Sequence, residues 1–439
     1  MSNWKTATLL IAIVSGAGSA GAQATNPPGN PPLTLGQARA LALKNHPQVL
    51  ASQALSLRAG QITRETKSAY FPTVNGNITG AQAEVNARIG AGLINDSRLF
   101  DHAGMGVTVA QLISDFGRTK NLVKNSSLLA QASKQDFQAS RFDVILAVDQ
   151  AYYEVLLAQQ LVVVAQETVK TRQTVVDQVT ELAKNQLRSQ VDVSFAAVNL
   201  ADAKLMLLRA QDRLQTAFAG LGQALGTDQA VEYKLQDQPM PPVPPATPDP
   251  LIAEAFQNRP ELASYRLQTN AAQSFVEAER DLKRPALSLI GVGGVLPYIH
   301  PGNANAGIPL TYESVAVNLQ IPIFNGFLFT SRRRAAEYQL QATEQRSRDL
   351  RDRVARDVRA AWDSARTSYE AISASEQLLK QANLALDLAQ GRYNLGLSSI
   401  VELTQGQLAQ TSAEVQNLNA KYEYQEAYAA LQYTVGLLH

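Results

Sequence analysis

Hydrophobic residues recur every seven positions in two stretches of the chain that lie about 210 residues apart. The first series is Val148, Val155, Val162, Val169, Val176 and Ala183. The second series is Val358, Ala365, Ile372, Leu379, Leu386 and Tyr393. A sustained seven-residue repeat predicts long helices in supercoiled contact. We expect them over residues 117–185 and 326–395, each roughly 100 Å long at about 1.5 Å per residue.

A second heptad series rich in alanine follows each long helix. One row is Ala196, Ala203, Ala210, Ala217 and Ala224, and the other is Ala413, Ala420 and Ala427. Alanine at every seventh position lets two helix backbones approach closely. Each long helix is therefore expected to turn and run back as a helical hairpin.

Four segments of about ten residues alternate between apolar and polar or small residues. The clearest spans residues 315–323, and the others span 73–82, 107–113 and 286–295. This length and alternation are typical of strands that cross a membrane as part of a barrel. Aromatic residues gather at one end of these segments: Tyr70, Phe71, Phe116, Phe324, Phe327 and Phe329. They fit an interfacial girdle, and core aromatics at strand ends are the alternative.

The same order of elements occurs twice, which predicts one duplicated unit. A helix containing Pro47 precedes the strand opened by Pro72, and a helix containing Pro260 precedes the strand opened by Pro285. The predicted organisation is a signal peptide over residues 1–22, a Pro-rich leader over 23–34, a first repeat over 35–238, a Pro-rich linker over 239–250 and a second repeat over 251–439. The loops 83–103 and 297–310 are expected outside the membrane.

Composition excludes several kinds of function. Lys and Arg number 39 against 38 for Asp and Glu, so overall charge gives no support for a nucleic-acid partner. There is no cysteine, the four histidines are isolated, and no pairing of an acid, base or nucleophile stands out. The glycines of residues 291–294 lie in an expected strand and do not open a helix, so they do not form a phosphate loop. We expect no enzyme activity, cofactor or metal. Arg332, Arg333 and Arg334 are expected in a solvated collar or at lipid headgroups.

Four strands cannot close a barrel with a usable lumen, because even eight strands leave room only for side chains. Oligomerisation is therefore expected. No stretch reaches the ~18 apolar residues of a membrane-spanning helix after the signal peptide.

Three motifs carry a family resemblance: the strand-to-helix junctions Gln111-Leu-Ile-Ser-Asp-Phe-Gly117 and Gln320-Ile-Pro-Ile-Phe-Asn-Gly326, and the turn Tyr393-Asn-Leu-Gly-Leu-Ser-Ser-Ile-Val-Glu402. Because the predicted elements occur twice in the same order and carry these motifs, the chain resembles the TolC family of outer-membrane efflux proteins. The resemblance implies a mostly α fold with a membrane β-barrel portion. It also implies a homotrimer with one twelve-stranded barrel in the outer membrane and an α-helical tunnel across the periplasm. The implied partners are a periplasmic adaptor, an inner-membrane pump of the RND or ABC type, and outer-membrane lipid.

The resemblance also assigns roles to the hairpin tips, which in this family close the tunnel and receive the adaptor. The adaptor-docking residues would be Gln186, Leu187, Arg188, Ser189, Gly396 and Leu397. Gly396 suits a tight turn that ends a helix, whereas Gln186 stands where the family usually has glycine, so docking at the first tip is expected to be altered.

The pore constriction would involve Glu402, Gln405, Tyr393, Asp192 and Ser398. Glu402 would give the trimer one carboxylate ring, which selects for cations, and an ordinary solvated helix residue is the alternative. Gln405 stands where a second acidic residue is common. Ser398 replaces an arginine of the closed-tip network, so a weaker or differently built lock is expected around Tyr393 and Asp192.

The function that follows is a passive exit duct for small molecules in a tripartite efflux system. A duct of a type I protein secretion system is the alternative within the same class. A secreted coiled-coil adhesin or structural protein is the alternative from another class.

Overall fold

The computed structural model describes residues 33–82, 102–227, 233–299 and 311–438. The predicted signal peptide and most of the Pro-rich leader and of the two loops lie outside these residues. The predicted domain boundaries stay predictions. No helix in the described parts of the chain is both long and apolar enough to cross a bilayer.

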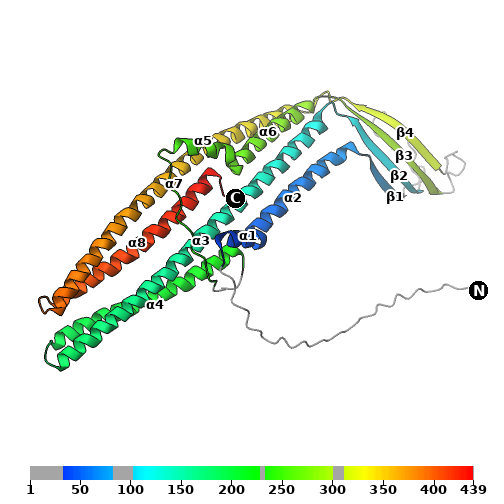
Figure 1. Ribbon diagram of the computed structural model, residues 1–439. Coiled ribbons are helices and arrows are strands. Elements are labelled where there is room, and N and C mark those ends of the chain that lie inside the picture. The colour runs from blue at the N-terminus through cyan, green and yellow to red at the C-terminus, as the bar shows by residue number, and fades with distance from the viewer. Residues whose placement is uncertain (1–32, 83–101, 228–232, 300–310, 439) are drawn as a thin grey trace, which may run out of the picture.

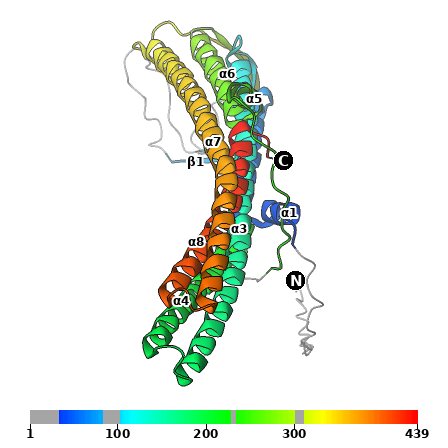
Figure 2. The same cartoon turned by 60° about the vertical axis from the view of Figure 1, so that its left-hand side comes forward.

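Two long helical hairpins dominate the molecule (Figure 1). The first is α3 (Arg118–Lys184) with α4 (Gln190–Leu225), and the second is α7 (Leu328–Asn394) with α8 (Ile400–Val435). Both outgoing helices have 67 residues and both return helices 36, which confirms the predicted duplication. The hairpins run side by side, and both turns lie at the end opposite the sheet (Figures 1 and 2).

The alanine rows lie at the contact between the two helices of each hairpin. Ala196, Ala203, Ala210, Ala217 and Ala224 are all buried, as are Ala413 and Ala420. The largest core cluster joins α3 and α4 around Val148, Val155 and Leu221, which are fully buried. The heptad pattern therefore predicted the contact surfaces of these helices correctly.

The helix expected before each sheet segment is in fact two helices, which corrects the sequence expectation. In the first repeat these are α1 (Leu35–Asn45) and α2 (Pro47–Lys67), and in the second α5 (Asp249–Asn258) and α6 (Pro260–Asp281). The residue before each proline is extended, with ψ 125° at His46 and 120° at Arg259. Proline disfavours the helical conformation of the residue before it, so the break lies in the sequence itself.

A four-stranded antiparallel sheet occupies the other end, in the order β1-β2-β3-β4. The strands are β1 (Thr73–Ala81), which follows the short helix η1 (Ser68–Tyr70), then β2 (His102–Ser114), β3 (Ala286–Ile299) and β4 (Thr311–Gln320). Several boundaries differ from expectation: β2 and β4 begin earlier than expected, at His102 and Thr311. β3 continues through Pro297 to Ile299, and β4 ends before Pro322, which lacks the N–H that would continue the ladder.

The strand register gives the sheet two chemically different faces. One face is mainly apolar, with Val74, Ile78, Met105, Val107, Val109, Leu289, Val315, Val317 and Leu319, and it also carries Gln111, Thr311 and Glu313. The opposite face carries Asn75, Asn77, Thr108, Ser288, Ser314 and Asn318 together with Ile290, Val292 and Tyr312. The apolar face is open to its surroundings, since Ile78 is 87% exposed and Val315 78%. β1 and β4 are both edges, so the sheet is open at each side.

The Pro-rich linker is fastened to the second hairpin by hydrogen bonds. The Tyr424 hydroxyl donates to the carbonyl of Pro242 at 2.5 Å, and Trp362 Nε1 donates to the carbonyl of Pro245 at 2.8 Å. These prolines have no N–H to offer, so their carbonyls are the available partners. The linker between the repeats is therefore held against the second hairpin by these hydrogen bonds.

Candidate functional site

Both hairpins reverse through the same backbone turn at their tips. Gln186 and Gly396 occupy the same position, each in the left-handed region, with φ 58° and 74°. In each turn the following residue closes a six-residue hydrogen bond: Leu187 N to Leu182 O at 2.9 Å, and Leu397 N to Arg392 O at 2.8 Å. This is the Schellman ending, in which glycine is favoured. The first tip thus keeps the turn of the second tip and holds a strained glutamine in it.

Asp192 has a local role at the start of α4. Its carboxylate accepts the N–H of Ser189 at 3.2 Å, while the Ser189 hydroxyl accepts the N–H of Asp192 at 3.2 Å. This reciprocal capping box satisfies two amides that the helix itself leaves unpaired. The resemblance implies a role for Asp192 in holding the closed tip, and within one chain its carboxylate is hydrogen-bonded to its own turn.

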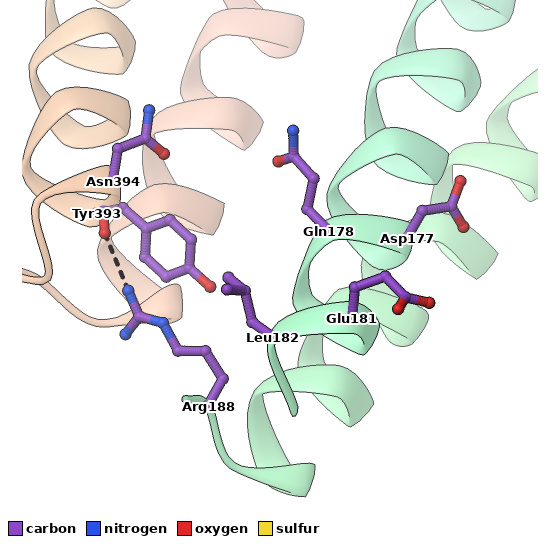
Figure 3. A pocket seen from close by; sticks show the side chains of 7 residues that line it. All are labelled: Asp177, Gln178, Glu181, Leu182, Arg188, Tyr393 and Asn394. Atoms are coloured by element: carbon purple, nitrogen blue, oxygen red, sulfur yellow. Dashed lines mark hydrogen bonds between the residues drawn. The ribbon is translucent and has the colours of Figure 1, made fainter. Parts of the chain in front are cut away.

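The two hairpins meet at the tip through Arg188 and Tyr393 (Figure 3). The Arg188 guanidinium lies 4.3 Å from the centroid of the Tyr393 ring, and Nη2 donates to the Tyr393 carbonyl at 2.9 Å. Cations favour the last carbonyls of a helix, and Tyr393 lies at the C-terminal end of α7. One arginine therefore uses both the aromatic face and the backbone of the opposite hairpin.

Tyr393 is held inside a small apolar cluster and is only 5% exposed. Its neighbours there include Val179, Ile400 and Leu403. Burial raises the pKa of the Tyr393 hydroxyl, an effect that the Arg188 charge opposes and the Asp192 charge reinforces. The hydroxyl oxygen has no hydrogen-bond partner among the described residues, so the ring and not the hydroxyl makes the contact.

Ser398 takes no part in this contact. Its buried hydroxyl oxygen lacks a hydrogen-bond partner within the described ranges. The resemblance predicts Arg188 only among the docking residues, and it places the missing arginine of the closed tip at Ser398. The contacting arginine comes from the other turn, 205 positions from Tyr393, a juxtaposition that no local pattern reveals.

Glu402 does not stand as a free carboxylate. Its Oε1 lies 3.0 Å from Nε of Arg392, and the two side chains are 42% and 56% exposed. Gln405 lies one turn further along α8 and is exposed. A ring formed by copies of Glu402 would therefore contain an equal number of arginines, which weakens the expected preference for cations.

A groove of about 700 Å³ opens beside the Arg188–Tyr393 contact. It is lined by Asp177, Gln178, Glu181, Leu182, Arg188, Tyr393 and Asn394 (Figure 3). The α3 side offers two carboxylates, and the α7 side offers the tyrosine and an amide. The groove thus lies between the two hairpins of one chain.

Further from the tip, the hairpins meet through apolar packing of Tyr422 and Ala429 against α3 and α4, and through polar contacts. Asn199 Nδ2 donates to Thr404 Oγ1 at 3.0 Å, and Arg172 is buried with its Nη2 3.5 Å from Thr411 Oγ1. Burial lowers the pKa of Arg172 to about 10. No ion pair to Arg172 occurs in the described parts of the chain. A buried cation without a carboxylate is costly, so Arg172 weakens the packing between the hairpins at its own position.

No group of three or more metal-ligating side chains occurs in the part of the chain that the structure describes.

Comparisons with known proteins agree on one family. A family model described as outer membrane efflux protein matches residues 38–227 and 251–437. The chain is 24% identical over 409 residues to outer membrane protein TolC of Vibrio cholerae, across 90% of this chain and 89% of that protein. It is 25% identical over 420 residues to alkaline protease secretion protein AprF of Pseudomonas aeruginosa, across 91% and 83% of the two chains. The crystal structure of the outer membrane protein VceC from Vibrio cholerae has a TM-score of 0.77 at 17% identity, covering 92% of this chain and 96% of that chain. The chain is a member of the outer membrane efflux protein family.

Proposed function

We propose that three copies of this chain form the outer-membrane exit duct of a tripartite efflux system, which conducts small molecules passively. The observation that carries this proposal is the two-faced sheet, with an open apolar face and two unpaired edges. An exposed edge strand is a template for pairing with another chain. Pairing β4 of one copy with β1 of the next removes every edge when the ring closes. Three copies supply the twelve strands of one barrel.

The helical hairpins would continue this barrel into the periplasm. At about 1.5 Å per residue, the 67-residue helices α3 and α7 extend roughly 100 Å from the sheet. A secreted coiled-coil adhesin, the alternative from another class, would have no use for the open apolar face of the sheet. The partners in this proposal are a periplasmic adaptor and an inner-membrane pump of the RND or ABC type.

The hairpin tips would form the periplasmic gate and the docking site of the adaptor. Gly396, Leu397 and the residues 186–189 surround the two turns, and the groove between the hairpins offers both carboxylates and an aromatic ring. We assign the closing contact within each chain to Arg188 and Tyr393, in place of the arginine that Ser398 lacks. Glu402, Gln405 and Asp192 line or support the same tip.

A duct for protein secretion is the second candidate, favoured by the similarity over most of its length to AprF, whose name refers to protease secretion. The sheet and hairpins suit both functions, because neither selects the cargo.

The test is crosslinking of the tagged protein in its native outer-membrane fraction, followed by mass spectrometry of the captured proteins. A trimer with an adaptor and a proton-driven pump supports efflux, and an ABC transporter supports secretion. A monomer recovered only from the soluble periplasm would overturn both proposals.

A further inference from the structure

Exposed cations occur at all four places where a helix meets a strand of the sheet. Lys67 ends α2 before β1, Lys120 lies in the first turn of α3, Lys283 precedes β3 and Arg334 lies in the second turn of α7. All four are exposed, and none forms an ion pair with a carboxylate of the described residues. We call these four residues the basic collar.

Two acidic side chains beside the collar, Glu279 and Asp281, are turned inward, whereas Glu65 and Glu337 are at least partly exposed. Glu279 is 2% exposed and Asp281 4%. Glu279 pairs with Arg332 at 3.1 Å, and Asp281 accepts from Asn121 Nδ2 at 2.9 Å. Because these carboxylates are buried, they leave the surface positive. The whole chain has a formal net charge of only +1, so positive charge is concentrated at this level of the molecule.

The N-terminus of α7 adds to this positive field. Its first turn contains no acidic residue, and its N-cap makes no side-chain hydrogen bond. The consecutive arginines Arg332, Arg333 and Arg334 follow directly. A helix N-terminus carries a partial positive charge that favours anions and disfavours cations. By contrast, Asp115 caps α3 through the N–H of Thr119 at 2.7 Å. Glu279 pairs with Arg332, and Glu337 pairs with Arg333 at 3.2 Å, so among these arginines Arg334 is the one left without a carboxylate partner in the described residues.

Exposed apolar side chains accompany the basic collar. Phe116 and Phe327 stand at corresponding strand-to-helix junctions, both in the left-handed region, with φ 54° and 67°. They are 51% and 73% exposed, and Phe324, which contacts Phe327 edge-on at 6.0 Å, is 79% exposed. A bulky residue with positive φ is strained. This exposure argues against the alternative of core aromatics for these three phenylalanines.

We propose that the basic collar binds the headgroups of anionic phospholipids in the periplasmic leaflet of the outer membrane. Phe116 and Phe327 then lie at the edge of the hydrocarbon. The inference rests on the proposed function, since it takes the apolar face of the sheet to lie in that membrane. A soluble anion would match the cations but leave the phenylalanines in water, whereas a phospholipid covers both.

The test compares the lipids that remain bound to the trimer purified from detergent micelles that contain phosphatidylcholine and phosphatidylglycerol, measured by native mass spectrometry. The variant is Lys67→Gln/Lys120→Gln/Lys283→Gln/Arg334→Gln, which spares the buried ion pairs. The matched control is Lys204→Gln/Arg348→Gln/Arg359→Gln/Lys380→Gln, four exposed cations along the hairpins without a carboxylate partner among the described residues. One cation near an anionic membrane surface is worth roughly a fivefold change in partition. We expect the phosphatidylglycerol enrichment to fall at least about fivefold in the collar variant and to persist in the control.

Equal enrichment in the collar variant and the unmodified protein would overturn the proposal, as would an equal loss in the control. Competition by millimolar inorganic phosphate would assign the cations to a free anion instead. If the collar variant does not assemble, the phosphatidylglycerol enrichment of the unmodified trimer is measured at increasing salt. Enrichment through exposed charges must fall as salt rises, and an enrichment that does not change would contradict the proposal. Conductance in phosphatidylcholine bilayers tests the channel separately: a protein that conducts without lipid preference refutes only the collar.

Discussion

Replacing Arg188 with glutamine should loosen the gate without unfolding the hairpins. A cation over an aromatic ring contributes about 1 kcal/mol at a partly exposed site. A hydrogen bond from a charged donor contributes about 1.5 kcal/mol or more. Arg188 makes both with Tyr393, at 4.3 Å to the ring centroid and 2.9 Å to the carbonyl oxygen. Their loss together amounts to about 2.5 kcal/mol per chain, or roughly a 60-fold shift toward the separated tips.

The assay is single-channel recording of the purified protein in planar bilayers, with the open probability as the readout. Arg188→Gln should raise the open probability by one to two orders of magnitude, an estimate that follows from the same interaction energies. Arg188→Lys should give an intermediate value, because it keeps the charge and loses the planar stack. Lys184→Gln is the control: it removes a cation from the same tip whose ion pair, with Glu181 at 2.7 Å, lies within α3.

An unchanged open probability in Arg188→Gln, with the trimer intact, would refute the assignment of the closing contact. An equal rise in Lys184→Gln would show that net charge at the tip, and not this contact, holds the gate.

Three further substitutions test separate parts of the structure. Tyr393→Phe should leave the open probability nearly unchanged, since the hydroxyl has no partner among the described residues, whereas Tyr393→Ala should open the gate as Arg188→Gln does. Gln186→Gly should raise the free energy of unfolding by about 1 kcal/mol, measured by denaturant titration, because it relieves a left-handed glutamine; a loss of stability would contradict this account. Burial, then Glu154 and Glu423, raise the pKa of Glu426 to about 7, although Arg213 opposes them. The folded chain thus binds this proton more tightly than the unfolded chain, so stability should fall as pH rises from about 4.5 to 7. Thermal melting across that range should show a flatter decline in Glu426→Gln, and identical pH profiles would contradict the burial argument.

The helix breaks show that some of the missing detail was present in the sequence. His46-Pro47 and Arg259-Pro260 each divide a predicted helix in two, and the residue before proline is the cause. The turn at Gln186 could likewise be predicted by alignment with Gly396 in the second repeat. Its strain became visible only in the backbone angle.

The long helices, the alternating strands and their duplication follow from the amino-acid sequence alone. Each of these depends on periodicity within a single segment, and hydrophobic burial acts on that periodicity wherever the segment packs. Phe116 and Phe327 could be placed at the strand ends in the same way, as could Gln186 and Gly396 at the tips.

Which side chains meet across segments depends on how the chain folds in three dimensions. Arg188 contacts Tyr393, Arg392 pairs with Glu402, and Glu279 is buried against Arg332. A long charged side chain can reach several neighbours with conformations of similar free energy. Its actual partner therefore depends on how the hairpins and junctions pack against one another. The sequence therefore specified the shape of the molecule, and the packing of its two repeats specified the contacts at the tips and at the collar.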